Sequence, residues 1–348
     1  MSYIMEEEIK AQKEIIKNLV KQYVQNYCVK VDIPSDIKKV VIVASGSSFN
    51  AGLFGKNFFE EIAQVETSVE HACEFSNSKF ENYSKDNLYV FISQSGNSKD
   101  AVCALTKAKE KGVKTFAVVN NPDSQAYKLA DFKIDINAGL ERAIAATKSF
   151  SATVFVLWLM AVKFAQNKQL DVSDEIKDIE LLEKTIVETT QDVDNLEVAA
   201  KLISKQKNVS IIGHAQKYAM ACEAALKIKE TSYVNTSPYP IGEFIHGHFA
   251  TLNEANTFMT FLDDSADEFE LNLLKKVQTT YKTNSIVVSN AYEDYNCDVL
   301  VKYPKSTSKI GNTLNAIIAL QMLALETAKL LKRDVDNPKG LCKVVSGK

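Results

Sequence analysis

Short runs of β-branched and aromatic residues recur along this chain, and each is closed by a turn and followed by a helical pattern. The first run, residues 40–43 (Val-Val-Ile-Val), is closed by Gly46 and precedes a helical pattern over about residues 50–62. Further strand patterns of this half lie at residues 88–92, 115–119 and 132–136, with helical patterns at 101–109 and 146–166. Strands that alternate with helices in this way predict a parallel sheet covered by helices on both faces.

The same alternation restarts in the second half of the chain. Strand patterns occupy residues 209–213, 258–262 and 285–288, and helical patterns occupy 220–231 and 314–331. Residues 5–27 have the apolar spacing of an amphipathic helix. The sequence therefore predicts an α/β protein with two similar domains in tandem. We expect a leading helix in residues 1–30, domains in 31–168 and 207–332, a helical connector in 169–206 and a tail in 333–348.

Composition excludes several other classes of protein. The 348 residues are 46% hydrophobic and 24% charged, which is typical of a globular chain with room for two domains. A net charge of −3 and a pI near 5.9 leave no basic surface for nucleic acid. The six cysteines form no metal-like cluster with the four histidines, which favours buried or idle thiols in a reducing cytosol.

Membrane insertion is not expected from this sequence. The N-terminus is acidic where a signal peptide would be basic and then apolar. The most apolar run, residues 151–165, is interrupted by Lys163 and is shorter than the roughly 20 apolar residues of a spanning helix. We therefore interpret it as a buried core helix and expect a cytoplasmic protein.

Two serine-rich loops each follow a predicted strand and precede a predicted helix. One is residues 44–48, which include Ser47 and Ser48, and the other is residues 93–98 (Ser-Gln-Ser-Gly-Asn-Ser). Ligands of parallel sheets bind beyond the carboxyl ends of the strands, where helix N-termini, glycines and hydroxyls suit a phosphate dianion. The loops contain no Lys or Arg and match neither the P-loop nor the Rossmann motif. Taken singly, each loop also suits an ordinary turn or N-cap.

Candidate acid–base residues cluster in the second half. Glu223, Lys227 and Glu230 are spaced i, i+4 and i+7, which places them on one face of a predicted helix. Shortly afterwards, His246 and His248 flank Gly247. A Glu, a Lys and a His could move a proton between two sugar carbons without a cofactor. The alternatives are an ordinary Glu–Lys surface pair and a metal site, and the absence of a nearby cysteine or further histidine disfavours the metal.

The two serine loops, together with residues 145–150 (Ala-Ala-Thr-Lys-Ser-Phe), resemble the sugar isomerase (SIS) domain family and, within it, the isomerase half of glucosamine-6-phosphate synthases. The resemblance runs from residues 5–9 to residues 334–338. It implies two tandem SIS domains, each a flavodoxin-like three-layer α/β/α sandwich.

The resemblance also implies roles for particular residues. Ile144 would meet the sugar through its backbone, and Lys227 would be a sugar-site lysine. Glu230 would be the isomerase base, His246 would open the sugar ring, and Lys343 of the tail would reach the sugar. The remaining positions match phosphate-binding residues of the family: Ser48, Ser93, Gln94, Ser95 and Ser98.

The chain departs from the family where Lys-His-Gly-Pro is usual and residues 245–248 read Ile-His-Gly-His. Its first residues already match the isomerase half, so we expect a chain without a glutaminase domain, similar to the stand-alone members of the family. The resemblance implies a cofactor-free phosphosugar isomerase or deaminase, with glucosamine 6-phosphate converted to fructose 6-phosphate and ammonia. The alternatives are a deglycase of fructosamine-type 6-phosphates and a non-catalytic sugar-phosphate sensor. A homodimer in which His246 completes the neighbour's site is also implied.

Overall fold

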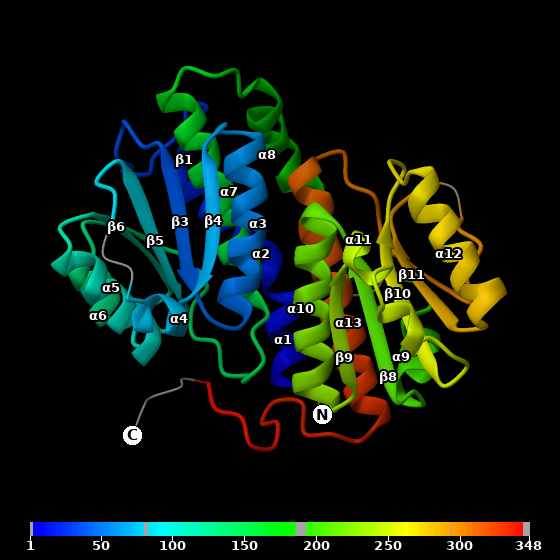
Figure 1. Ribbon diagram of the computed structural model, residues 1–348. Helices are drawn as coiled ribbons and strands as arrows, with labels where there is room; N and C mark the ends of the chain where they lie inside the picture. The colour runs from blue at the N-terminus through cyan, green and yellow to red at the C-terminus, as the bar shows by residue number, and fades with distance from the viewer. Residues whose placement is uncertain (1–2, 80–82, 186–192, 293, 344–348) are drawn as a thin grey trace. The chain divides into compact units, whose positions relative to one another are not determined.

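The computed structural model describes residues 3–79, 83–185, 193–292 and 294–343 (Figure 1). In this part of the chain the residues form two compact units, each built on one five-stranded sheet. The first unit comprises residues 11–141, 148–180 and 342–343. The second comprises residues 3–10, 142–147 and 181–341.

The first unit contains a parallel sheet with the strand order β4-β3-β5-β6-β7. Its strands are β3 (Lys39–Ala44), β4 (Glu66–His71), β5 (Asn87–Ser93), β6 (Lys114–Val119) and β7 (Phe132–Asp135). The helices of this unit are α2 (Gln12–Tyr23), α3 (Ser47–Glu61), α4 (Ala72–Asn77), α5 (Lys99–Glu110), α6 (Gln125–Leu129), α7 (Lys148–Asn167) and most of α8 (Ser173–Thr185).

The central strands of this sheet are apolar at consecutive positions, such as residues 40–44 of β3 and 88–92 of β5, which is the pattern of strands buried on both faces. Val41 and Val43 pack on the side of α4, α5 and α6, whereas Ile42 faces α3. Figure 1 shows α3 and the group of α4, α5 and α6 on opposite sides of this sheet. Gly52 and Gly55 lie on that face of α3. A Cβ atom at Gly52 would come within 2.9 Å of Ile42 Cγ2 and one at Gly55 within 3.1 Å of Ile42 Cδ1, so glycine is what allows the helix to approach the sheet closely.

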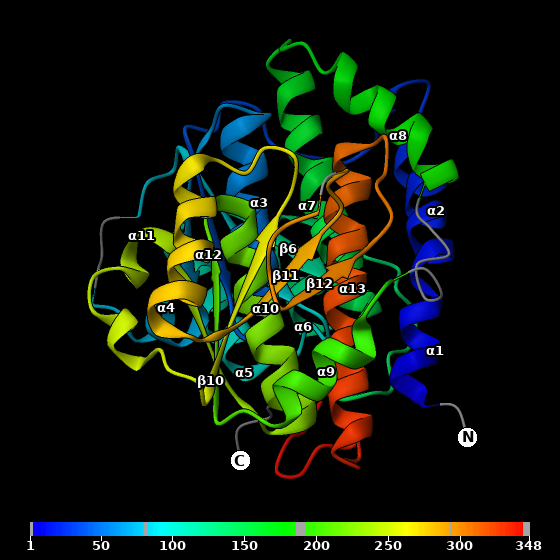
Figure 2. The same cartoon turned by 90° about the vertical axis from the view of Figure 1, so that its right-hand side faces the viewer.

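The second unit repeats the arrangement with the order β12-β11-β10-β8-β9, again parallel throughout. Its strands are β8 (Asn208–Gly213), β9 (Asn235–Pro240), β10 (Asn256–Leu262), β11 (Asn284–Ser289) and β12 (Val299–Lys302). Its helices are α1 (Ile4–Lys10), α9 (Leu196–Ser204), α10 (Ala215–Ser232), α11 (Ile241–Phe244), α12 (Glu268–Tyr281), α13 (Lys309–Leu330) and the 3₁₀ turn η1 (His248–Thr251). Figure 2 shows α12 and α13 on opposite sides of the strands.

Both sheets have the same winding. In each, the strand that comes first in the chain lies between the second and the third, which gives the flavodoxin-like order 2-1-3-4-5. The predicted three-layer α/β/α fold is therefore confirmed. The winding changes direction between β3 and β5 in the first sheet and between β8 and β10 in the second, and such switch points are where α/β sheets bind ligands.

The N-terminal segment differs from the single helix predicted over residues 5–27. The structure has two helices, α1 and α2, followed by the short antiparallel strands β1 (Val24–Gln25) and β2 (Cys28–Val29). The break has a packing reason. Met5 and Ile9 of α1 pack on α13, whereas α2 packs on α7 and so belongs to the other unit.

The predicted core helix around residues 151–165 is α7. It is long and apolar enough to cross a membrane by length and composition, but 89% of its apolar window is buried inside the protein. All six cysteines are free. None of them is buried, because Cys28, Cys103 and Cys342 are exposed and the other three are partly exposed.

Candidate active site

The two serine-rich loops lie side by side, at the switch point of the first sheet. β3 and β5 are hydrogen-bonded neighbours that run parallel, so the loops that leave their carboxyl ends meet at one edge of the sheet. The first loop leads into α3, which begins at Ser47, and the second leads into α5, which begins at Lys99. Two helix N-termini therefore point at this edge, which is the setting in which proteins bind phosphate groups.

Three hydroxyls of the second loop form one cluster. Ser98 Oγ lies 3.1 Å from Ser93 Oγ and 3.4 Å from Ser95 Oγ. Ser98 is the N-cap of α5, but its hydroxyl makes no capping hydrogen bond and is turned into the cluster instead. The loop is held tightly, since Gly96 has φ +63° and a Cβ atom there would collide with Ser124.

The two serine-rich loops, residues 44–48 and 93–98, together form what we call the serine cradle. Two further side chains of this cradle are available to a ligand. The Ser48 hydroxyl and the Gln94 side-chain amide form no hydrogen bond with any other residue in the described ranges. Gly46, the N-cap of α3, has φ +57°, and a Cβ atom built there would meet nothing within 4 Å. The backbone before α3 therefore borders open space, into which an anion could be received without displacing protein atoms.

The equivalent switch point of the second sheet has a different chemistry. His214 follows β8, Lys217 lies in the first turn of α10 and Asp263 follows β10, where the first sheet carries serines. Lys217 Nζ lies 3.3 Å from both Asp263 Oδ1 and Glu270 Oε1, and His214 Nδ1 lies 3.4 Å from Glu270 Oε1. Carboxylates at these positions repel a phosphate, so of the two switch points the first is the one suited to it.

The predicted acid–base residues of the second unit meet on α10 as expected from their spacing. Lys227 is 1% exposed and its Nζ lies 2.5 Å from Glu230 Oε2 and 3.6 Å from Glu223 Oε1. Glu223 is fully buried, whereas the Glu230 side chain is 23% exposed. The lysine thus pairs with two carboxylates, of which Glu230 is the one that solvent reaches. An ordinary surface pair, the alternative left open by the spacing, does not fit this burial.

His246 lies on a separate, exposed segment after α11, and none of its described contacts is with the Lys227 cluster. Its backbone N–H donates to the Glu243 carbonyl at 3.0 Å. Ile144, whose backbone was expected to meet a sugar, donates its N–H to the Asp336 carbonyl at 3.1 Å. In the described residues no group of His, Cys, Asp and Glu side chains is arranged to hold a metal ion.

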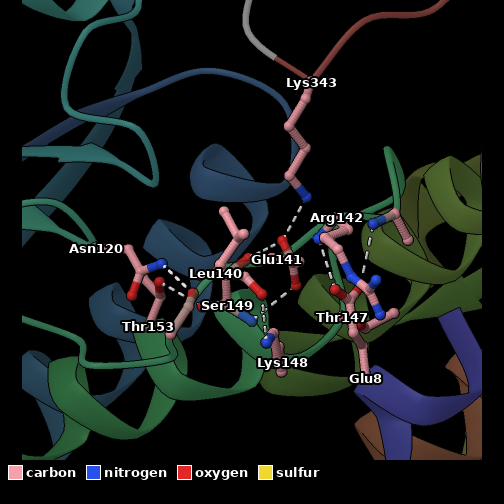
Figure 3. A network of polar contacts seen from close by, with 12 residues as sticks. Glu8, Asn120, Leu140, Glu141, Arg142, Thr147, Lys148, Ser149, Thr153 and Lys343 are labelled. Atoms are coloured by element: carbon pink, nitrogen blue, oxygen red, sulfur yellow. Dashed lines mark hydrogen bonds and ion pairs between the residues drawn. The ribbon is translucent and has the colours of Figure 1, made fainter. Parts of the chain in front are cut away.

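Lys343 of the tail contacts Glu141, a residue that the sequence did not single out (Figure 3). The Glu141 side chain is fully buried and also accepts hydrogen bonds from Ser149, by the backbone N–H at 3.0 Å and by the hydroxyl at 2.6 Å. Burial by itself would raise the pKa of this carboxyl, but the Lys343 ammonium and the Ser149 donors outweigh it and hold the pKa below its ordinary value. Glu141 is therefore an anionic anchor for Lys343.

A family model, "SIS domain", matches residues 35–163 and 202–295, which together are more than half of the chain. The chain belongs to the SIS domain family. The first matched stretch contains all five strands of the first sheet, and the second contains β8 to β11 of the second sheet. The resemblance that the serine loops indicated is therefore confirmed, and the two matched stretches have the same winding.

Among curated proteins, the chain is 30% identical over 350 residues to a glutamine–fructose-6-phosphate aminotransferase [isomerizing] from Campylobacter jejuni. The match covers 99% of this chain but 58% of that protein, so the chain spans little more than half the length of this relative. The corresponding enzyme of Aquifex aeolicus is 31% identical over 89% of this chain and 52% of its own length.

Among solved structures, the C-terminal domain of glucosamine-fructose-6-phosphate aminotransferase from Francisella tularensis aligns with a TM-score of 0.87 and 25% identity. The alignment covers 97% of this chain and 99% of that one. A glucosamine-6-phosphate deaminase from Thermotoga maritima aligns with a TM-score of 0.78 at 21% identity, over 98% of this chain and 99% of the other, and shares the fold.

Proposed function

We propose that the protein is a phosphosugar isomerase or isomerising deaminase, and that its substrate is glucosamine 6-phosphate, which it converts to fructose 6-phosphate and ammonia. The observation that carries the proposal is the Glu223–Lys227–Glu230 cluster, in which a buried lysine leaves one carboxylate, Glu230, within reach of solvent. A sensor would need the phosphate cradle but not this cluster. The likeness to the isomerase part of the aminotransferases supports the same class of chemistry.

In the proposed mechanism the serine cradle holds the phosphate, through Ser47, Ser48, Ser93, Gln94, Ser95 and Ser98 and the N–H groups of the two helix N-termini. No cationic side chain lies in either loop, so the binding comes from dipoles and hydroxyls. Ile144 would contribute its backbone to the sugar site. The proposal also divides the chain into domains at residues 31–168 and 207–332 and a tail at residues 333–348.

We assign ring opening to His246, which would transfer the proton between the ring oxygen and the anomeric hydroxyl. Glu230 would then remove the proton from C2 of the open aldehyde and return it at C1, while O1 gains a proton and the amine nitrogen loses one. This converts the aldehyde and the C2 amine into the C2 imine of fructose 6-phosphate, an internal redox exchange that needs no external oxidant. Water adds to the imine and ammonia leaves. Lys227 and Lys343 would stabilise the negative charge that develops on the enolic oxygen.

The direct test is ammonia release from glucosamine 6-phosphate, followed by a coupled assay, with fructose 6-phosphate measured in parallel. Both products are expected, and Glu230→Gln should abolish them while sugar-phosphate binding persists. Absence of both products at millimolar substrate would refute the deaminase. Release of amine from a fructosamine 6-phosphate instead would identify a deglycase, and binding without any turnover would identify a sensor. We also propose that the protein is a cytoplasmic homodimer and needs no cofactor. Sedimentation tests the dimer, and activity of the metal-free protein tests whether a metal is required.

A further inference from the structure

His246 lies in a short exposed segment, residues 245–247, whose two flanking residues are packed against the protein. Ile245, His246 and Gly247 are exposed, while the residues on either side are packed: Phe244 is fully buried and His248 is half-buried. The helix α11 ends at Phe244 and η1 begins at His248, so the three exposed residues form a short protrusion between two helical turns. Gly247 turns the chain with φ +123°, a conformation that other residues rarely adopt.

Three aromatic rings close the base of this protrusion. The centroid of the His248 ring lies 4.2 Å from that of Tyr239, and 6.2 Å from that of Phe244 with the two planes 12° apart. Tyr239 and Phe244 themselves lie 5.3 Å apart. These separations lie in or near the range of attractive aromatic contacts. His248 therefore joins the far end of the protrusion to its near end through ring contacts.

The ring cluster is anchored in the core of the second sheet. Tyr239 belongs to β9, and Phe244 also packs on Phe258 of β10, with centroids 5.9 Å apart. The rings of Phe244 and Phe249 lie 5.2 Å apart, with their planes at 66°. Strands β9 and β10 both pair with β8, so the base of the protrusion is fixed to a rigid sheet rather than to another loop.

The position of this protrusion depends on contacts made by its neighbours. Gly247 has more backbone freedom than any other residue type, so it does not by itself fix the direction of the chain. His248 follows it directly, and its ring reaches both Tyr239 and Phe244. We propose that His248 is a positioning residue, whose ring contacts with Tyr239 and Phe244 hold His246 in its productive place. This inference rests on the proposed function, in which His246 opens the sugar ring.

The proposal predicts a specific pattern of kinetics for variants of this chain. His248→Ala should lower kcat for glucosamine 6-phosphate by about 10- to 100-fold, because small misplacements of a catalytic group cost rates of that order, while KM changes by less than about threefold. His248→Phe, which keeps a stacked ring, should stay within about threefold of the wild type. Equal losses in His248→Phe and His248→Ala would overturn the proposal, as would an unchanged kcat in His248→Ala.

A double-mutant cycle separates positioning of His246 from general damage. In a His246→Asn background the residue that His248 positions is gone, so adding His248→Ala should change kcat by less than about twofold. A further 10-fold loss would show that His248 acts through something else and would overturn the proposal. Similar thermal midpoints for the variants would confirm that the comparison is made between folded proteins.

We call the ring contacts of His248 with Tyr239 and Phe244 the clamp. Hydrogen exchange tests, without relying on activity, whether this clamp restrains the segment that carries His246. In peptides that cover residues 245–248, exchange should speed up at least about 10-fold in His248→Ala and remain near the wild-type rate in His248→Phe. Unchanged exchange in His248→Ala would refute the clamp. If exchange behaves as expected but neither the wild type nor any variant turns over phosphosugars, the proposed function fails and, with it, the catalytic role of the clamp.

Discussion

The ammonium of Lys343 contacts the buried carboxylate of Glu141, and the same carboxylate accepts two hydrogen bonds from Ser149 in the first turn of α7. One side chain thus joins the tail of the chain to the start of the helix that fills the core of the first unit (Figure 3). Because we assign Lys343 to charge stabilisation, Glu141 links the stability of this unit to the chemistry.

Replacing Glu141 by Gln should reduce both stability and activity. The amide can still meet Ser149 but cannot pair with the ammonium, so we expect the free energy of unfolding to fall by about 1–3 kcal/mol in urea titrations. The kcat should fall with it, because Lys343 loses its anchor. Glu326→Gln, which removes a partly exposed partner of Lys329, is the control and should cost less than about 1 kcal/mol. Equal costs in the two variants would contradict the assigned role.

The same carboxyl predicts a pH dependence of stability. The pKa of Glu141 is lower in the folded protein than its ordinary value of 4.5, so the folded state binds fewer protons there than the unfolded state. The contribution of Glu141 to the free energy of unfolding is therefore complete above about pH 5 and is lost as the pH falls through the folded-state pKa. The difference in unfolding free energy between wild type and Glu141→Gln should shrink in acid. A difference that grows below pH 4 would contradict this sign.

Lys227 is expected to be essential for folding stability as well as for the site. Lys227→Met leaves the fully buried Glu223 without its cation, and breaking a buried pair in this way costs about 3–5 kcal/mol. Adding Glu223→Gln should recover part of that loss, since the buried negative charge is removed together with its cation. Lys229→Met on the exposed side of the same helix is the matched control, and thermal unfolding of all four proteins makes the measurement.

Ser98 should act mainly on substrate binding. Its hydroxyl touches those of Ser93 and Ser95, and Ser98→Ala removes a donor to a doubly charged group. We expect KM for the sugar phosphate to rise about 10-fold, as for one hydrogen bond to a charged group, with kcat within about twofold. Thr106→Ala on the same helix, whose hydroxyl donates to the Val102 carbonyl at 2.8 Å, should leave KM unchanged. A change in kcat alone would refute a phosphate role for Ser98.

One sugar phosphate should bind per chain. The switch point of the second sheet is filled by the ion pairs of Lys217 with Asp263 and Glu270, and it lacks the serine hydroxyls of the first. Calorimetric titration of the Glu230→Gln protein with glucosamine 6-phosphate should give a stoichiometry near one. Lys217→Ala should leave that stoichiometry unchanged, whereas Ser48→Ala should weaken binding. A stoichiometry of two would contradict the prediction that the second switch point does not bind the sugar phosphate.

Part of the fold could be predicted from the sequence because central strands of a parallel sheet are buried on both faces. Residues 40–43 and 88–92 are continuous apolar runs, and the structure places them in β3 and β5. The edge strands β4 and β9 were not predicted. Each pairs on one side only, so β4 tolerates two glutamates and β9 two prolines, and neither has the pattern of a strand.

The sequence by itself determined the repeated α/β pattern, the two serine loops and the spacing of Glu223, Lys227 and Glu230, because helical and strand periodicities are local properties of the chain. Only the tertiary structure decided that β3 and β5 are neighbours, that Lys227 is buried between its carboxylates, and that Glu141 holds Lys343. The last two residues are 202 positions apart. Contacts at such separations arise from the packing of whole elements, and no periodicity of the chain encodes them.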